Sequence, residues 1–235
     1  MTTAIEVKER PILMSGPMVK AIFEGRKTQT RRICKPACDL GGEMAGSVHP
    51  ARESGWIAWW PGNDPGLAEF TKLAYKDGFQ CPYGKPGDRL WVRETWCHAA
   101  TSGYDAPSDG REIPVWYRAS DEGEVDASED LDGNRAGWKP SIHMPRWASR
   151  ITLEITSVKA ERLQDISQQD VLAEGIIEAT KDEKLIKYGL REWPWMDWHL
   201  DHQSAFKQLW ESIHGPDSWA TNPWLWVIEF KRVEK

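Results

Sequence analysis

A predicted helix passes directly into a predicted strand through Gly25-Arg26-Lys27-Thr28-Gln29-Thr30-Arg31-Arg32. Ahead of this stretch, apolar residues recur at the i, i+3, i+4 spacing of a helix, at Val19, Ile22 and Phe23. Gly25 can end that helix, because glycine adopts the left-handed backbone that commonly follows a last helical turn. The β-favouring residues from Thr28 to Ile33 then predict a strand or an extended loop.

The same stretch concentrates charge and hydroxyl groups. Arg26, Lys27, Arg31 and Arg32 lie here in a chain whose formal net charge is -6, so we expect a phosphate-bearing ligand to bind here. Thr30 could act as a nucleophile with the Lys27 amine as its base, since burial and neighbouring cations lower a lysine pKa. The alternative is that the cations bind phosphate and Thr30 is only a strand hydroxyl. Both alternatives place the ligand in the same pocket.

Composition limits the class of protein. Its 235 residues, with 30 Lys and Arg against 36 Asp and Glu, suit one large domain or a small domain with insertions, and do not suit a protein that coats long duplex nucleic acid. No run approaches the roughly 20 apolar residues of a membrane span. Residues 1–10 lack the apolar segment of a signal peptide. With four cysteines only, we expect a cytoplasmic protein that does not contact membranes.

The remaining elements follow from periodicity and from turn residues. We expect a helix that begins after Ser167, with Asp170 at the capping-box position, and a last strand whose two faces are both apolar and which therefore lies inside a sheet. The predicted strands are residues 89–94, 113–118, 151–158 and 224–233, and the later helices are 167–175 and 203–214. No βα repeat is present, so the order predicts an α+β fold with a mixed or antiparallel barrel-like sheet and helices outside it.

Several separated motifs resemble the ASCH domain, the activating-signal-cointegrator homology group of the PUA-like superfamily. They are the helix ending in Gly25-x-Lys27-x-x-Thr30-x-Arg32, the Gly87-Asp88 turn before a strand, and Ala173-Glu174-Gly175 at a helix end. Segments 90–96, 140–150 and 209–213 are similar to longer ASCH proteins of tailed phages and prophages. The resemblance implies a PUA-like (ASCH) mixed β-barrel with flanking helices. It forms a single domain over residues 10–233, with irregular insertions at 37–83 and 99–137.

The resemblance also implies a function. The family is thought to bind RNA or modified nucleosides in a pocket beside the first helix. Some small members hydrolyse the acetyl group of N4-acetylcytidine with a Lys-x-x-Thr pair and a later Glu, which here fall on Lys27, Thr30 and Glu174. The expected partner is therefore a nucleoside or a single-stranded nucleic acid, with RNA favoured over DNA, in the host cytoplasm if the gene is phage-borne. Hydrolysis of an N-acyl cytidine by an amidohydrolase is the sharper hypothesis.

Three alternatives stay open at this point. The chain could be a non-catalytic module that binds RNA or a modified base. It could be a metal-dependent ribonuclease, since one member of the family has been described as such. It could also be a phage accessory protein that binds a host protein through an apolar patch around residues 56–60.

Further ligand-binding candidates lie outside the first motif. Glu94 either lines the pocket or forms a structural ion pair, and Trp96 either stacks on a base or packs in the core. His143 and Arg146 lie in a loop bounded by prolines, which either closes on the ligand or is a rigid connector.

Zinc is the one metal that the cysteines suggest. Cys34, Cys38 and Cys81, with either Cys97 or His98, could supply four zinc ligands. Tight C-x-x-C spacing is absent, so we predict no metal and no cofactor.

Overall fold

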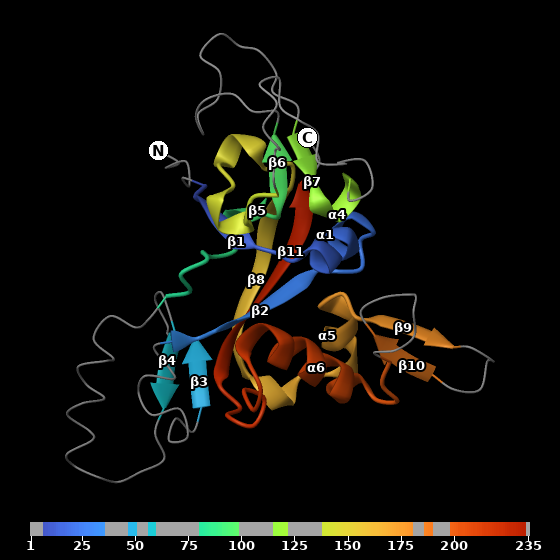
Figure 1. Cartoon of the computed structure of the whole chain (residues 1–235). Coiled ribbons are helices and arrows are strands. Elements are labelled where there is room, and N and C mark those ends of the chain that lie inside the picture. Colours follow the sequence, from blue (N-terminus) through green and yellow to red (C-terminus); the bar gives the residue numbers. More distant parts are fainter. Residues whose placement is uncertain are drawn as a thin grey trace, which may run out of the picture.

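The computed structural model describes residues 7–35, 47–50, 56–59, 80–98, 115–121, 138–180, 186–189 and 198–233. Its centre is a five-stranded sheet (Figure 1). The strands, in spatial order, are β1 (Glu9–Leu13), β5 (Arg89–Arg93), β8 (Thr152–Arg162), β11 (Trp224–Val233) and β2 (Gln29–Ile33). β1 and β5 are parallel and the other neighbours are antiparallel. The predicted α+β class is confirmed.

The sheet is open, which corrects the expectation of a β-barrel. β1 and β2 are its two edges, and within the described ranges no backbone ladder joins them. A side chain bridges these edges instead, since Arg32 Nη2 on β2 donates to the carbonyl of Leu13 on β1 at 2.7 Å. Closure into a barrel would require a ladder of backbone hydrogen bonds between β1 and β2. In the described residues a guanidinium contact joins these two strands instead.

β11 lies inside the sheet, as its two apolar faces predicted. It pairs with β8 on one side and β2 on the other, and its residues from Trp224 to Ile228 are all buried. A register shift between Glu229 and Phe230 interrupts its pairing with β8. Because side chains on both faces of this strand are covered, the large tryptophans of its first half belong to the main core.

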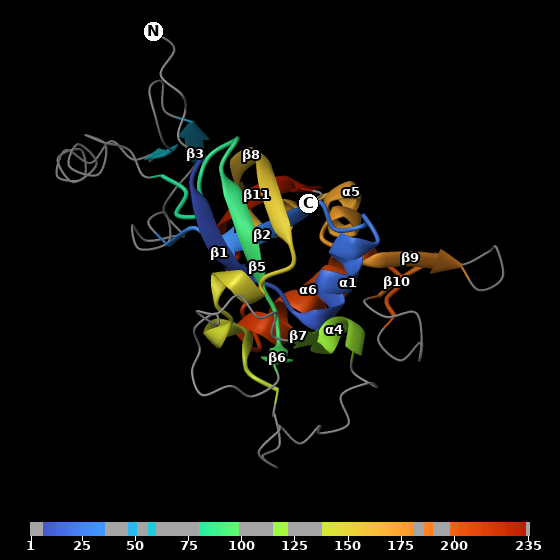
Figure 2. The same ribbon diagram turned by 90° about the horizontal axis from the view of Figure 1, so that it is seen from above.

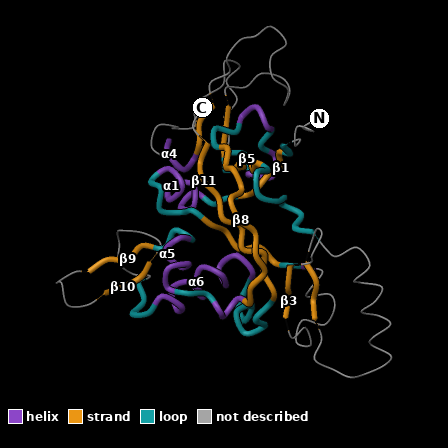
Figure 3. Tube along the Cα trace, turned by 180° about the vertical axis from the view of Figure 1, so that it is seen from behind, coloured by secondary structure: helices purple, strands orange, loops and turns teal. Residues whose placement is uncertain are grey.

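In the described part of the chain, four helices accompany the sheet: α1 (Gly16–Phe23), α4 (Arg118–Asp121), α5 (Gln168–Ala173) and α6 (His202–His214). α1 and α4 lie side by side (Figure 2), and α1 and α5 both lie beside β2 (Figure 3). Ser167 caps α5 as predicted, accepting from the Asp170 backbone N–H. Asp170 accepts from the Ser167 hydroxyl in return, not from its backbone N–H, because its side chain is one methylene shorter than the glutamate of a capping box.

Within the described ranges, three antiparallel hairpins lie outside the main sheet: β3 (Ser47–Pro50) with β4 (Trp56–Trp59), β6 (Trp96–His98) with β7 (Val115–Tyr117), and β9 (Ile177–Thr180) with β10 (Ile186–Gly189). The insertion expected at 37–83 therefore contains a regular hairpin. Most of that insertion, most of 99–137 and the side chains of the patch expected around 56–60 lie outside the described residues. In the described part of the chain no helix has the length and apolar character needed to cross a membrane.

Three short 3-10 turns complete the described structure: η1 (Ser141–His143), η2 (Arg146–Ala148) and η3 (Leu163–Asp165). The buried side chains form one large cluster between the sheet and the helices, and a second, small cluster of Trp96, Met144 and Ala148.

Candidate functional site

The C-terminal ends of α1 and α5 meet through two matching turns. After α1, the Arg26 N–H donates to the Ala21 carbonyl and the Gly25 N–H to the Ile22 carbonyl. After α5, the N–H groups of residues 176 and 175 make the equivalent bonds to residues 171 and 172. Both turns are Schellman motifs, and their glycines have φ angles of 73° and 99°. The helix end predicted at Gly25 is therefore correct.

Gly175 is required for the two turns to approach each other. A Cβ atom at this position would lie 2.9 Å from the Ala21 Cβ and 3.4 Å from the Lys27 Cβ. Its positive φ also disfavours any residue with a side chain. The motif Ala173-Glu174-Gly175 thus has a steric function, which is to bring α5 against the chain that leaves α1.

Three consecutive donors on that chain bind three consecutive carbonyls at the end of α5. The Thr28 N–H donates to the Ala173 carbonyl at 2.9 Å. Lys27 Nζ donates to the Glu174 carbonyl at 2.9 Å, and Arg26 Nη1 to the Gly175 carbonyl at 2.8 Å. Carbonyls at a helix C-terminus have no partner within their helix, so cationic donors are well placed here.

Lys27 and Glu174 form a buried ion pair at the centre of this junction. Lys27 Nζ lies 2.6 Å from Glu174 Oε2, and the two side chains are 0% and 3% exposed. Burial lowers the pKa of Lys27 from its ordinary value; the Glu174 carboxylate opposes this shift, and the charges of Arg32 and Arg31 add to it. The fold therefore makes Lys27 easier to deprotonate to its neutral amine than an ordinary lysine is.

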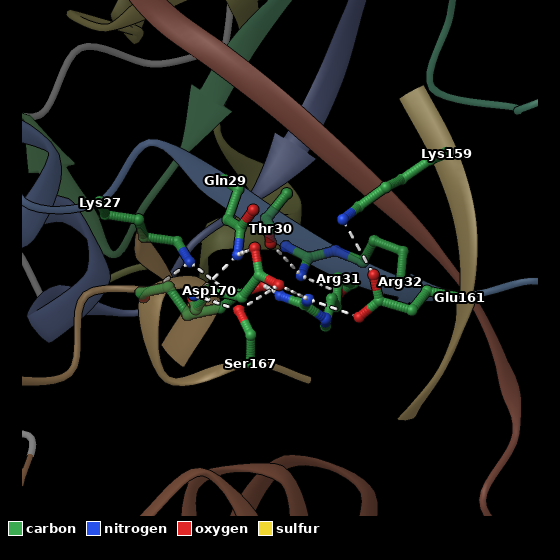
Figure 4. A network of polar contacts seen from close by, with 10 residues as sticks. Lys27, Gln29, Thr30, Arg31, Arg32, Lys159, Glu161, Ser167 and Asp170 are labelled. Carbon is green, nitrogen blue, oxygen red and sulfur yellow. Dashed lines mark hydrogen bonds and ion pairs between the residues drawn. The ribbon is translucent and has the colours of Figure 1, made fainter. Parts of the chain in front are cut away.

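Arg31 extends the network to two further carboxylates (Figure 4). Its guanidinium lies 3.3 Å from Glu174 Oε1, 2.9 Å from Glu161 Oε1 and 3.4 Å from Asp170 Oδ2. The neighbouring Gln29 amide donates to the backbone and side-chain oxygens of Asp170. Arg31 Nε is buried and has no hydrogen-bond partner among the described residues, although every other nitrogen of this guanidinium has one.

Alternate residues of this stretch make different contacts. Lys27, Gln29 and Arg31 bind groups of α5 and β8, as described above, with the period of two that a strand imposes. Thr30 contacts Arg32 instead, because its hydroxyl accepts a hydrogen bond from Arg32 Nη1 at 2.7 Å. Among the described residues Lys27 and Thr30 share no hydrogen bond, so the expected base and nucleophile are not in contact in this conformation.

Of the four cations expected to bind phosphate, Arg26, Lys27 and Arg31 are paired with carboxylates. Glu161, Asp170 and Glu174 face Lys27 and Arg31, and Lys159 adds a further cation at 2.9 Å from Glu161. Lys27 and Arg31 therefore lie in a network with as many carboxylates as cations, whereas Arg32 has no carboxylate partner among the described residues. An incoming phosphate would compete with these carboxylates for Lys27 and Arg31.

The Arg32 and Arg26 side chains also have structural contacts. Arg32 donates to the Leu13 and Arg31 carbonyls as well as to Thr30, and burial lowers its pKa against the opposing effects of Tyr83 and Glu174. Arg26 forms an ion pair with Glu24 in addition to its bond to Gly175. Both arginines hold segments of the fold together around the network.

Glu94 belongs to a separate cluster. It is 2% exposed and binds Arg150 through both carboxylate oxygens, at 2.9 and 3.0 Å. Burial raises its pKa, and Arg150 acts in the opposite direction. Of the two alternatives for this residue, the ion pair is the one that the structure describes.

Trp96 packs in the core and does not offer a face to a ligand. It is 0% exposed, stacks on His98 with ring centroids 5.1 Å apart, and meets Trp147 edge to face at 5.8 Å. The expectation that Trp96 stacks on a base is therefore wrong, because the hairpin β6–β7 and the η1–η2 segment cover the indole on both sides.

His143 and Arg146 do not line the network either. Both are exposed, on η1 and η2, which lie apart from α5 in Figures 1 and 3. Arg146 Nε binds Glu9 Oε2 at 3.0 Å, so this loop is attached to β1. Of its two expected roles, that of a connector fits these contacts.

The sequence interpretation missed Gln29, Glu161 and Asp170 in the network and Arg150 beside Glu94. A signal for Gln29 was present, since it shares the period of two with Lys27 and Arg31. Glu161 and Asp170 carry no such local signal, because they reach Arg31 from more than a hundred residues away.

Metal ligands do not gather in the part of the chain that the structure describes. There, no group of three or more His, Cys, Asp or Glu residues is arranged to hold a metal ion. The thiols of Cys34, Cys81 and Cys97 are buried, and Cys38 lies outside the described residues.

The junction thus brings together groups capable of proton transfer and hydrogen bonding. Lys27 and Glu174 are in direct contact, Arg31 has a spare buried donor, and the Thr30 hydroxyl is held by a guanidinium. Comparison of the chain with models of known protein families, with curated proteins and with solved structures finds no match.

Proposed function

We propose that this network recognises the base of a nucleoside, either free or in a single-stranded nucleic acid, on a PUA-like domain of the ASCH type. The observation that carries the proposal is the fully buried ion pair of Lys27 and Glu174 with Arg31 beside it. Buried ion pairs contribute little net stability, whereas titratable groups with shifted pKa values gather at functional sites. The mixed sheet with α1 and α5 beside its edge strand supports the assignment of the domain type.

The balance of charge favours an uncharged polar ligand group at this point. Lys27 and Arg31 are matched by carboxylates, so a base or an amide, which brings donors and acceptors without net charge, fits better beside them than a phosphate. The unpartnered Arg31 N–H is a donor for a carbonyl oxygen of such a group. The preference for RNA over DNA rests on the resemblance to ASCH proteins alone.

Hydrolysis of an N-acyl group is the second candidate function. It is favoured by the lowered pKa of Lys27 and by the Arg32 guanidinium on the Thr30 hydroxyl, which stabilises a developing alkoxide. Thr30 Oγ1 would attack the acyl carbonyl and pass its proton to the Lys27 amine. The cytidine amine would leave with that proton, and water would hydrolyse the threonine ester to release the acid. Thr30 is 0% exposed and shares no hydrogen bond with Lys27 among the described residues, so this chemistry requires the two side chains to come into contact and Thr30 to become open to the ligand.

Calorimetric titration with cytidine and N4-acetylcytidine tests both functions. We expect binding by the wild type, a loss of binding in Glu174→Gln and Lys27→Met, and no change in Lys231→Met, whose ion pair with Glu154 lies on the surface. Circular dichroism of each variant separates loss of binding from loss of the fold. Absence of any nucleoside affinity in the folded wild type would refute the proposal.

Chromatography of the N4-acetylcytidine reaction then separates binding from hydrolysis. Thr30→Val removes the hydroxyl at nearly constant volume. Product from wild type but not from Thr30→Val would establish hydrolysis, and equal product from both would remove Thr30 from the mechanism.

A further inference from the structure

We infer that single-stranded nucleic acid makes a second contact, outside the buried network, on the exposed ring of Phe23 at the end of α1. This inference rests on the proposed function insofar as it takes the ligand to be a nucleic acid. It goes beyond that function by naming a separate surface and by making an oligonucleotide, rather than a free nucleoside, the full ligand.

Phe23 is 42% exposed although it is a large apolar residue, and it belongs to a stack of aromatic rings and guanidinium groups. Arg150 Cζ lies 3.9 Å from the centroid of the Tyr117 ring and 4.7 Å from that of Phe23. Arg232 Cζ, near the end of β11, lies 5.2 Å from the Phe23 centroid. Figures 1 and 3 show α1, α4 and this end of β11 side by side. Four separate segments thus contribute planar groups to one surface.

Hydrogen bonds hold the Arg150 and Tyr117 side chains of the stack in place. The buried Glu94 binds Arg150 through two oxygens, and the Ser120 hydroxyl accepts a third bond from Arg150 at 2.9 Å. The Tyr117 hydroxyl donates to the Ala148 carbonyl at 2.8 Å, which fixes the other ring. Arg150 therefore loses little freedom when a ligand binds, and this preorganisation favours affinity.

The surface also carries positive charge that is not cancelled. Glu94 neutralises Arg150, but Arg232 and Lys20 are exposed and, among the described residues, form no ion pair. Lys20 lies one helical turn before Phe23 on the same face of α1. In a chain of net charge -6, this site thus combines an exposed ring with two spare cations.

A nucleic acid uses both features of this surface. Bases stack on aromatic rings and on guanidinium planes, and the phosphates between them bind the cations. An acidic peptide would use the charges but would leave the ring and the guanidinium planes unmatched. Phe23 is four residues before Lys27 in the chain. We therefore take the base on Phe23 to be a neighbour of the base in the network.

Fluorescence anisotropy with a labelled single-stranded RNA of about eight nucleotides tests this contact in the full chain. We expect Phe23→Ala to weaken binding about tenfold and Phe23→Tyr, which keeps a ring, to retain it. Arg232→Gln should weaken binding mainly at low salt and reduce the salt dependence by about one phosphate contact. Ile213→Ala, at an apolar position of α6 that is 53% exposed, is the matched control.

Each other outcome overturns the inference, and nucleoside titration shows separately whether the proposed function survives. Unchanged RNA affinity in Phe23→Ala and Arg232→Gln would exclude the surface, even if cytidine still binds at the network. Absence of RNA binding by the wild type would do the same. Complete displacement of the RNA by polyglutamate at lower concentration than by unlabelled RNA would assign the surface to an acidic protein partner.

Discussion

Two buried charges in this protein are held in opposite ways. Asp88 is 3% exposed, and burial raises its pKa, but donors from the Lys8 and Lys85 backbone and from Arg10 outweigh burial and leave the pKa below its usual value. Lys27 is 2% exposed, and there burial outweighs the attraction of Glu174, so its pKa is also lowered.

The same direction of shift has opposite meanings for the two residues. A lowered pKa favours the charged form of an acid, so the fold around Asp88 stabilises its charge. A lowered pKa favours the neutral form of a base, so the fold around Lys27 works against its charge. A charge that the fold supports is structural, whereas a charge that the fold opposes is a candidate for function.

The largest expected effect breaks the network at its shared carboxylate. Glu174→Ala leaves Lys27 and Arg31 buried without this partner and should lower the free energy of unfolding by about 4 kcal/mol, measured by urea denaturation. The control Glu154→Ala, whose partner Lys231 is 62% exposed, should cost less than about 1 kcal/mol. A loss in Glu174→Ala as small as in the control would mean that the ion pair is not buried in solution.

Gly175→Ala tests whether the network requires the close approach of α5 to the chain that leaves α1. The new Cβ meets Ala21 at 2.9 Å on a backbone of positive φ, and crowding and strain together should cost about 3 kcal/mol by the same measurement. Gly25→Ala is a matched control, since Gly25 ends a Schellman motif of the same kind but has no neighbour within 4 Å. That variant should lose about 1 kcal/mol. Equal losses in both variants would contradict the close approach of α5.

Asp88→Asn tests the supported charge. The substitution removes the negative charge from a side chain that accepts hydrogen bonds from Lys8, Lys85 and Arg10. It should lower the free energy of unfolding by about 2 kcal/mol at pH 7. Because the folded-state pKa is lowered, this stability is present above 3.8, the ordinary value, and is lost as the pH falls through the folded-state pKa. The two proteins should therefore converge in acid. Asp217→Asn is the control, because Asp217 is exposed and Asn adopts its backbone angle of φ 62° as readily as Asp does.

The smallest effect is expected from the titration of Lys27, since Glu174 offsets part of the cost of burial. With the folded-state pKa lowered, the unfolded chain binds the proton more tightly between that pKa and 10.5. The free energy of unfolding of the wild type should then rise relative to that of Lys27→Met as the pH increases through this interval. A difference that is constant with pH would show that Lys27 titrates normally.

Local patterns predicted much of the fold. The helix before Gly25, the cap at Ser167, the helix that ends at His214 and the buried last strand all follow from spacing and turn residues, which act over a few positions. Openness of the sheet was not predictable in this way. It depends on whether β1 and β2 meet, and these edges are connected by one side-chain bond from Arg32.

The candidate site likewise has features that local patterns predicted and features that they did not. Local spacing indicated that Lys27 and Arg31 lie together, and the ASCH resemblance placed Glu174 in the same site as Lys27, because the spacing and a helix-end motif act over a few residues. Three features of the site depend on tertiary packing. Glu161 and Asp170 pair with Arg31, the Thr30 hydroxyl accepts a hydrogen bond from Arg32, and Trp96 lies in the core. Charge pairing and burial depend on which distant segments pack together, and no local pattern encodes that.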